Sequence, residues 1–98
     1  MKWWAYIVRC VDGTFYTGYA RDPIKRAGAH NAGRGAKYTA GRRPVVLVYT
    51  EGCRTRNRAM AREWALKQMP RADKESLIAV WLSAISTPAP EDSPDGRR

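Results

Sequence analysis

A chain of 98 residues allows one small domain with a compact core, and its two cysteines make neither a disulfide framework nor a zinc-binding pattern. Its 18 lysines and arginines outnumber 9 acidic residues, and the resulting net charge of +9 favours an anionic partner. No apolar run reaches the roughly 18–20 residues of a membrane span, and no signal-peptide stretch follows the first residues. We therefore expect a soluble, cytoplasmic protein without a membrane partner.

The chain begins with a predicted β-hairpin. Residues 3–10 are rich in aromatic and β-branched side chains, which is typical of a buried strand. The dipeptide Asp12-Gly13 is a strong turn signal, and residues 15–19 are expected to return antiparallel to the first strand.

A helix and a loop follow the hairpin. Asp22 before Pro23 is typical of a helix N-terminus, and Gly33 is expected to end this helix. The segment 31–43 is rich in glycine, alanine and arginine, which predicts a flexible basic loop.

The second half predicts one strand and two helices. Residues 45–50 form the strand, and Thr55 can cap a helix that runs to Met69 before Pro70. We expect this helix to pack on the sheet through its large apolar residues, which are Met60, Trp64 and Leu66. The four tryptophans at positions 3, 4, 64 and 81 are expected in the core or at its rim, although an exposed one could stack on an unpaired base.

Asp73 is expected to cap the last helix, which has a broad apolar stripe made of Leu77, Ile78, Val80, Trp81, Ala84 and Ile85. This stripe is a candidate docking face for a protein partner. Residues 87–98 mix prolines with charges and predict a disordered tail. The predicted fold is therefore a single α/β domain, residues 1–86, with the order β-β-α-β-α-α and a three-stranded sheet flanked by helices.

The positive charge is concentrated in residues 1–86, which hold sixteen lysines and arginines against six acidic residues. Thirteen of the eighteen basic residues are arginines, which suit bidentate phosphate contacts. We expect a nucleic-acid partner, DNA in the first place and RNA as an alternative. The candidates for backbone contacts are the basic residues of the loop, Arg34, Lys37, Arg42 and Arg43.

Four positions combine the side chains that phosphodiester hydrolysis needs. Arg26 and His30 are spaced i and i+4 on one helix face, so one could neutralise phosphate charge and the other could carry a proton. Glu63 is a carboxylate among cations that could hold one divalent metal ion. Tyr6 could act as a base only if cations or a metal depressed its pKa.

Each of these residues also has a simpler interpretation. Arg26 and His30 could be ordinary surface residues, and Glu63 could merely pair with Lys67 on the same helix. Tyr6 and Tyr16 could be core residues of their strands.

The series of motifs resembles the GIY-YIG nuclease family. Trp4-Ala5-Tyr6 stands where the family has Gly-Ile-Tyr, and Tyr16-Thr17-Gly18 stands where it has Tyr-Ile-Gly. Arg26, His30 and Glu63 match its later motif residues, and the segment 33–39 resembles the small stand-alone bacterial subgroup, which is similar to the domain of Slx-type endonucleases. The glycine and isoleucine of the first motif are replaced here by Trp4 and Ala5.

The resemblance implies an endonuclease that uses Mg²⁺ or Mn²⁺ to cut DNA at branched or single-stranded structures in repair or recombination. Tyr6 would be the base or position the water, and Tyr16 would assist it. Arg26 would stabilise the transition state, His30 would assist proton transfer or orient Tyr6, and Glu63 would hold the metal. The alternative functions are a catalytically weak nucleic-acid-binding module and a subunit that cuts only with a partner. We expect a monomer or weak dimer.

Overall fold

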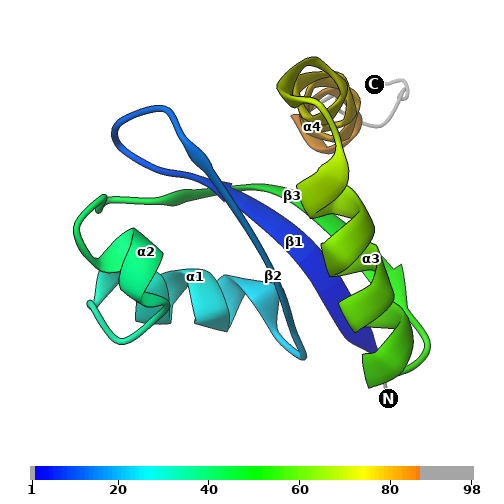
Figure 1. Cartoon of the computed structure of the whole chain (residues 1–98), viewed down its shortest axis with the longest axis horizontal. Coiled ribbons are helices and arrows are strands. Elements are labelled where there is room, and N and C mark those ends of the chain that lie inside the picture. Colours follow the sequence, from blue (N-terminus) through cyan, green and yellow to red (C-terminus); the bar gives the residue numbers. More distant parts are fainter. Residues whose placement is uncertain (1, 87–98) are drawn as a thin grey trace, which may run out of the picture.

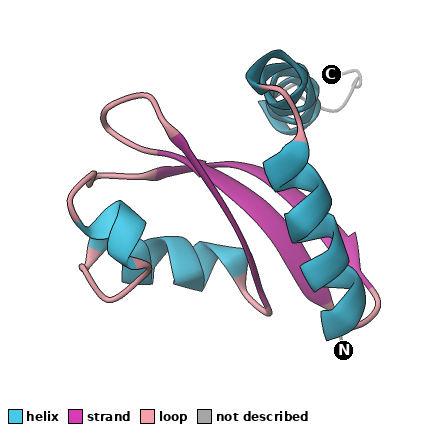
Figure 2. Ribbon diagram, in the orientation of Figure 1, coloured by secondary structure: helices cyan, strands magenta, loops and turns pink. Residues whose placement is uncertain are grey.

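The computed structural model describes residues 2–86, so the predicted tail at 87–98 lies outside the described residues. The elements follow the predicted order, with one short extra helix between the first helix and the third strand (Figures 1 and 2). Their bounds are β1 Trp3–Arg9, β2 Phe15–Ala20, α1 Pro23–Asn31, α2 Lys37–Ala40, β3 Val46–Cys53, α3 Arg56–Gln68 and α4 Arg71–Ser86.

The three strands form one antiparallel sheet with β1 in the centre, in the order β2-β1-β3. The hairpin turn confirms the Asp12-Gly13 signal, since Gly13 has a φ of +85° and the Asp12 carboxylate accepts two hydrogen bonds from Thr14. Tyr6 faces Gly18 on β2 and Thr50 on β3. Because β1 is the central strand, Tyr6 lies between a residue of β2 on one side and a residue of β3 on the other.

Side chains alternate between the two faces of β1 and build two separate core clusters. Tyr6 and Val8 pack in one cluster, beside which Ala27 of α1 is half-buried, and Ile7 packs in the other with Ile78 of α4. Figure 1 shows α1 and α3 on opposite sides of the sheet. No helix within residues 2–86 is long and apolar enough to cross a bilayer.

Two predicted helix N-termini are confirmed and one is wrong. The side chains of Asp22 and Thr55 accept hydrogen bonds from the backbone amides three residues later, at 3.1 Å in both cases. Asp73 is not a cap, because α4 already begins at Arg71 and directly follows Pro70. Asp73 instead lies in the first turn, where its negative charge suits the helix dipole.

The predicted apolar sides of α3 and α4 differ from the observed ones. In α3 the fully buried residues are Ala59 and Leu66, whereas 67% of Trp64 is exposed. Residues 59 and 66 are two turns apart, so they share one narrow stripe, and the bulkier Met60 and Trp64 lie outside it. Exposed apolar residues of α4, Val80 and Ile85, likewise lie outside the part of its stripe that packs on the sheet.

Candidate active site

Tyr6 is positioned by the glycine opposite it on β2. Only 1% of Tyr6 is exposed, and a β-carbon on Gly18 would lie 2.5 Å from the phenolic oxygen. Any larger residue at position 18 would therefore displace the phenol. This contact explains why a glycine follows Tyr16-Thr17 in the second motif: it lets the Tyr6 ring cross β2 toward α1.

The phenol meets a buried histidine on α1. The Tyr6 oxygen lies 2.9 Å from Nε2 of His30, whose side chain has no exposed surface. On its other side, His30 Nδ1 lies 2.7 Å from the hydroxyl of Thr39, a buried residue of α2. The segment around α2 can close over the imidazole because Gly35 leaves room, since a β-carbon there would clash with His30. The predicted flexible loop is thus a packed segment that covers His30.

The hydrogen-bond lengths favour one tautomer of His30. The Thr39 hydroxyl also lies 2.9 Å from the carbonyl oxygen of Ala36, and its single proton can be donated only once. If it donates to Ala36, then His30 Nδ1–H donates to Thr39 and Nε2 accepts from Tyr6. In the opposite tautomer, Nδ1 has no proton and accepts from the Thr39 hydroxyl, which then no longer donates to the Ala36 carbonyl. The bond gained in exchange, from the Ala36 amide to Nδ1, is longer, at 3.3 Å. We assign the chain in which Tyr6 donates to His30.

The pKa values agree with neutral groups at both ends of this hydrogen bond. Burial raises the pKa of Tyr6 to about 12, although Arg26 acts in the opposite direction. The condition that the sequence set for Tyr6 to act as a base, a pKa depressed by cations, is therefore not met, because burial raises this pKa more than Arg26 lowers it. Burial, and then the charge of Arg26, lower the pKa of His30 below its usual value of 6.5. At neutral pH His30 is thus a free acceptor for a proton from Tyr6.

Tyr16 and Arg26 lie beside Tyr6 and His30. The Tyr16 ring meets His30 edge-on at 5.3 Å between centroids and stacks on Tyr38 at 5.9 Å. Arg26 is half-exposed on α1, one helical turn before His30. The simpler interpretation of Arg26 and His30 as unrelated surface residues does not hold for His30, which is buried.

Glu63 of α3 lines a pocket together with Tyr6, Tyr16 and Arg26. This pocket has a volume of about 320 Å³ and is also lined, from the first turn of α3, by Arg56. Glu63 also forms the predicted i,i+4 ion pair with Lys67, at 3.3 Å, and 21% of its side chain is exposed. The ion pair with Lys67 therefore does not exclude a role for Glu63 in the pocket, because the side chain makes this pair and lines the pocket at the same time.

The donor set of this pocket fits a hard divalent cation that takes few ligands from the protein. Within residues 2–86 no group of three or more acidic, histidine or cysteine side chains gathers to form a metal cage. Glu63 is the carboxylate in the pocket, and magnesium accepts such sites when water and substrate phosphate oxygens supply the other ligands. Glu63 is thus the residue that would hold a metal here.

The four basic loop residues proposed to contact nucleic acid are arranged in two different ways. Arg34 and Lys37 are exposed. Arg42 is held by Asp12 at 3.1 Å and by the Tyr38 carbonyl at 2.8 Å, and Arg43 donates to the Ala40 carbonyl at 2.8 Å. Arg42 and Arg43 therefore stabilise the segment around α2, and Arg34 and Lys37 are the better candidates for phosphate contacts.

The structure adds Thr39 and Arg56 to the residues selected from the sequence. Thr39 is nine residues from His30, and no helical or strand spacing links the two positions. Arg56 was one cation among many in the sequence, but its guanidinium donates to the Tyr19 hydroxyl at 3.2 Å and lines the pocket. The sequence did contain one signal for Arg56, which is its position directly after the Thr55 cap. The side chains of the first turn lie at the N-terminal end of a helix, where they can reach a neighbouring pocket.

Replacing Thr39 by valine is expected to destabilise the fold by about 1–3 kcal/mol, because the buried His30 N–H loses its acceptor. Thr39→Ser keeps the hydroxyl and should recover most of this loss. Denaturant unfolding of both variants measures the difference. Destabilisation by serine but not by valine would mean that the methyl group, and not the hydroxyl, matters at this position.

The amino-acid sequence is similar to a known protein family and to several known proteins. The family model described as "GIY-YIG catalytic domain" matches residues 2–76. A UPF0213 protein of Halobacterium salinarum is 53% identical over 73 residues, which cover 74% of this chain and 95% of that protein. A UPF0213 protein of Staphylococcus saprophyticus is 51% identical over 78 residues, covering 80% of this chain and 95% of that one.

Two solution NMR structures are similar to this fold. One, a UPF0213 protein of Bacillus halodurans, is 41% identical with a TM-score of 0.52, over 82% of this chain and 85% of that one. The other, a protein of E. faecalis, is 41% identical with a TM-score of 0.55, over 83% and 86%. The family model spans the hairpin, α1 and α3, which are the elements that bring Tyr6, Arg26 and Glu63 to one pocket. This chain belongs to the family of GIY-YIG catalytic domains.

Proposed function

We propose that this protein is a metal-dependent endonuclease that hydrolyses phosphodiester bonds of DNA. Membership of the GIY-YIG catalytic domains implies a nuclease in general. The observation that carries the finer proposal is the chain of hydrogen bonds from Tyr6 through His30 to Thr39, which begins at a pocket lined by Arg26 and Glu63. This arrangement supplies a proton path, a cation for the phosphate and a carboxylate for a metal in one place.

The proton path follows from the protonation states. Tyr6 is a neutral phenol, so its oxygen can accept the proton of an attacking water while its own proton passes to His30 Nε2. His30 becomes an imidazolium, and the Thr39 hydroxyl continues to accept the hydrogen bond from Nδ1–H. The phenol thus acts as a relay, and His30 is the base that takes up the proton.

Positive side chains of α1 and α3 face the charge that develops on the phosphate. Arg26 and Arg56 line the pocket from two sides, and a guanidinium suits the non-bridging oxygens of a phosphodiester. A divalent cation held by Glu63 would add Lewis-acid stabilisation of the phosphate oxygens. Tyr16 holds the His30 ring in place through its edge-on contact and is therefore proposed as a positioning residue.

The substrate is proposed to be DNA with an accessible strand, such as a branched or single-stranded structure. The pocket is small, at about 320 Å³, and lies beside a sheet edge, where a single strand can approach. The exposed Arg34 and Lys37 are proposed as further contacts to the backbone of that strand.

A cleavage assay tests this function. Purified protein is incubated with labelled nicked, flapped, branched and single-stranded DNA and with single-stranded RNA, in Mg²⁺, Mn²⁺ or EDTA. We expect cutting of DNA that EDTA abolishes and that either metal restores. Salt-sensitive binding without cutting under any of these conditions would instead support a nucleic-acid-binding module, or a subunit that needs a partner.

A further inference from the structure

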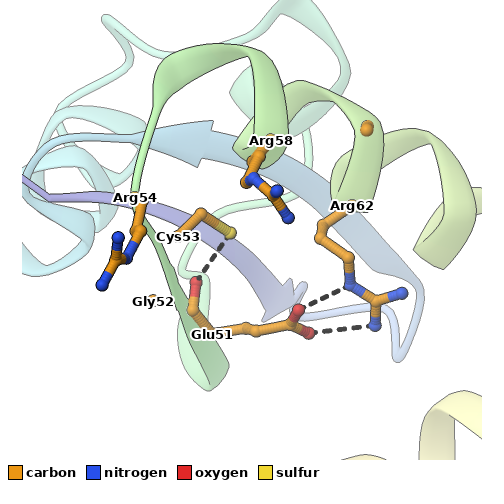
Figure 3. Close-up of a pocket in the computed structure, with 7 residues that line it drawn as sticks. Glu51, Gly52, Cys53, Arg54, Arg58 and Arg62 are labelled. Carbon is orange, nitrogen blue, oxygen red and sulfur yellow. Dashed lines mark hydrogen bonds and ion pairs between the residues drawn. The ribbon is translucent and has the colours of Figure 1, made fainter.

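A second basic hollow lies where β3 leads into α3, away from the active-site pocket. It has a volume of about 630 Å³, and its charged walls are Glu51 from β3 and three arginines, Arg54, Arg58 and Arg62. Figure 3 shows the three guanidinium groups in sequence around the hollow, with the buried Cys53 between Arg54 and Arg58. One carboxylate against three guanidinium groups leaves this hollow strongly positive.

The single carboxylate is already fully engaged. Arg62 donates to both oxygens of Glu51, at 2.5 and 3.0 Å, and the Tyr49 hydroxyl donates to one of them at 2.9 Å. This bidentate pair, dashed in Figure 3, fixes Arg62 at the wall and neutralises its charge. Glu51 therefore cannot also balance Arg54 and Arg58.

Arg54 and Arg58 are the two unbalanced charges of the hollow. Both side chains are exposed, and no acidic residue within residues 2–86 pairs with either of them. Two exposed and unpaired guanidinium groups on one concave surface attract an anion. Their planar forks suit the oxygens of a phosphate group, which each can bind with two parallel hydrogen bonds.

The hollow and the active site lie on opposite flanks of α3. Arg58 and Arg62 are one turn apart and line the hollow, whereas Arg56 and Glu63 are about two turns apart and line the active-site pocket. The two openings share no lining residue. Arg54 and Arg56 stand on either side of the Thr55 cap, so they continue the positive surface from one opening to the other around the start of the helix.

We propose that this hollow binds a phosphate of the nucleic-acid backbone outside the scissile bond, through Arg54 and Arg58. This inference rests on the proposed function, because it concerns the same strand whose bond is cut in the active site. The helix that separates the two openings is about 10–12 Å across with its side chains, so a strand of a few nucleotides spans the distance. The hollow therefore fixes the direction in which the strand leaves the active site.

The test is the salt dependence of oligonucleotide binding in EDTA, where no cleavage occurs. The variant Arg54→Gln/Arg58→Gln is compared with Arg9→Gln/Lys74→Gln, which removes the same charge from the opposite end of β1 and from α4. If the two arginines together neutralise one backbone phosphate, removing both makes the slope of log K against log salt shallower by about 0.7 on a single strand. The control slope is expected to stay at the wild-type value.

Three outcomes would overturn the inference. Equal slopes for the two double variants would show that only the overall charge matters. Binding of inorganic phosphate that Arg54→Gln/Arg58→Gln abolishes, with an unchanged oligonucleotide slope, would assign the hollow to a free anion. Absence of oligonucleotide binding by the wild-type protein would remove the inference together with the proposed function, whereas binding without cutting would contradict only the proposed function.

Discussion

Glu63→Gln is expected to abolish cleavage and to leave nucleic-acid binding intact. The substitution keeps the size of a side chain that is 21% exposed, but it removes the carboxylate of the active-site pocket. Loss of a metal-holding group removes several kcal/mol of transition-state stabilisation, so turnover should fall by at least about 10³-fold. Binding measured in EDTA should be unchanged or tighter, because a negative charge near the phosphates is lost.

A matched control separates this effect from the loss of an ion pair. Glu75 also forms an i,i+4 ion pair, with Arg71 at 2.9 Å, although here the basic residue comes first; its side chain is 53% exposed and does not line the active-site pocket. Either glutamine variant should lose only about 0.3–0.5 kcal/mol of unfolding free energy. If Glu63→Gln weakened binding in parallel with turnover, or unfolded the protein, Glu63 would be a structural residue.

The sequence was sufficient for the order of the three strands and of every helix except α2, because local signals decide this order. The Asp12-Gly13 turn and the caps at Asp22 and Thr55 specify where elements begin, and each is confirmed by its hydrogen bonds. The spacing of Arg26 and His30 placed them one turn apart on α1. Spacing could not show that His30 points into the protein, since this depends on what packs over it.

The loop before β3 shows why composition misled. Glycines predict flexibility when only the chain is considered, but Gly35 is required here for close contact with His30. Gly33 has a φ of +81°, which lets the chain turn back over α1. Neither role can be distinguished from flexibility without knowing the neighbour in space. The same limit hid Thr39, whose partner His30 is defined only once α2 has packed.

The helix α3 shows a different limit, because residue size outweighed spacing in the prediction. Trp64 and Met60 were expected to pack on the sheet, but the smaller Ala59 and Leu66 form the buried stripe. The helix α3 packs on β1 and β2, and Ala59, which has no exposed surface, is small enough to allow a close approach. Glu63 lies one turn after Ala59 and three residues before Leu66, so its position on α3 is beside this buried stripe.

Tyr6→Phe is expected to reduce turnover by roughly 10²-fold or more, because the ring remains but the proton relay to His30 is cut. Tyr49→Phe is the matched control, since Tyr49 is also a tyrosine whose pKa burial raises to about 12, and it does not line the active-site pocket. Turnover at saturating substrate should change little in that variant. A similar loss in both variants would mean that removing a buried tyrosine hydroxyl lowers turnover in general, so that the loss at Tyr6 is not evidence of proton transfer.

The pH dependence of turnover distinguishes a relay through His30 from a tyrosinate base. His30 accepts the proton only when neutral, so the rate should rise with pH through a midpoint below 6.5, the usual value from which burial lowers its pKa. From about pH 7 to 9 the rate should then be level, because a phenol with a pKa of about 12 stays protonated throughout. A rate that instead increases about tenfold per pH unit across that range would identify a deprotonated phenol or hydroxide as the base. In that case burial of Tyr6 would oppose catalysis, and the hydrogen bond to His30 would serve only to orient the ring.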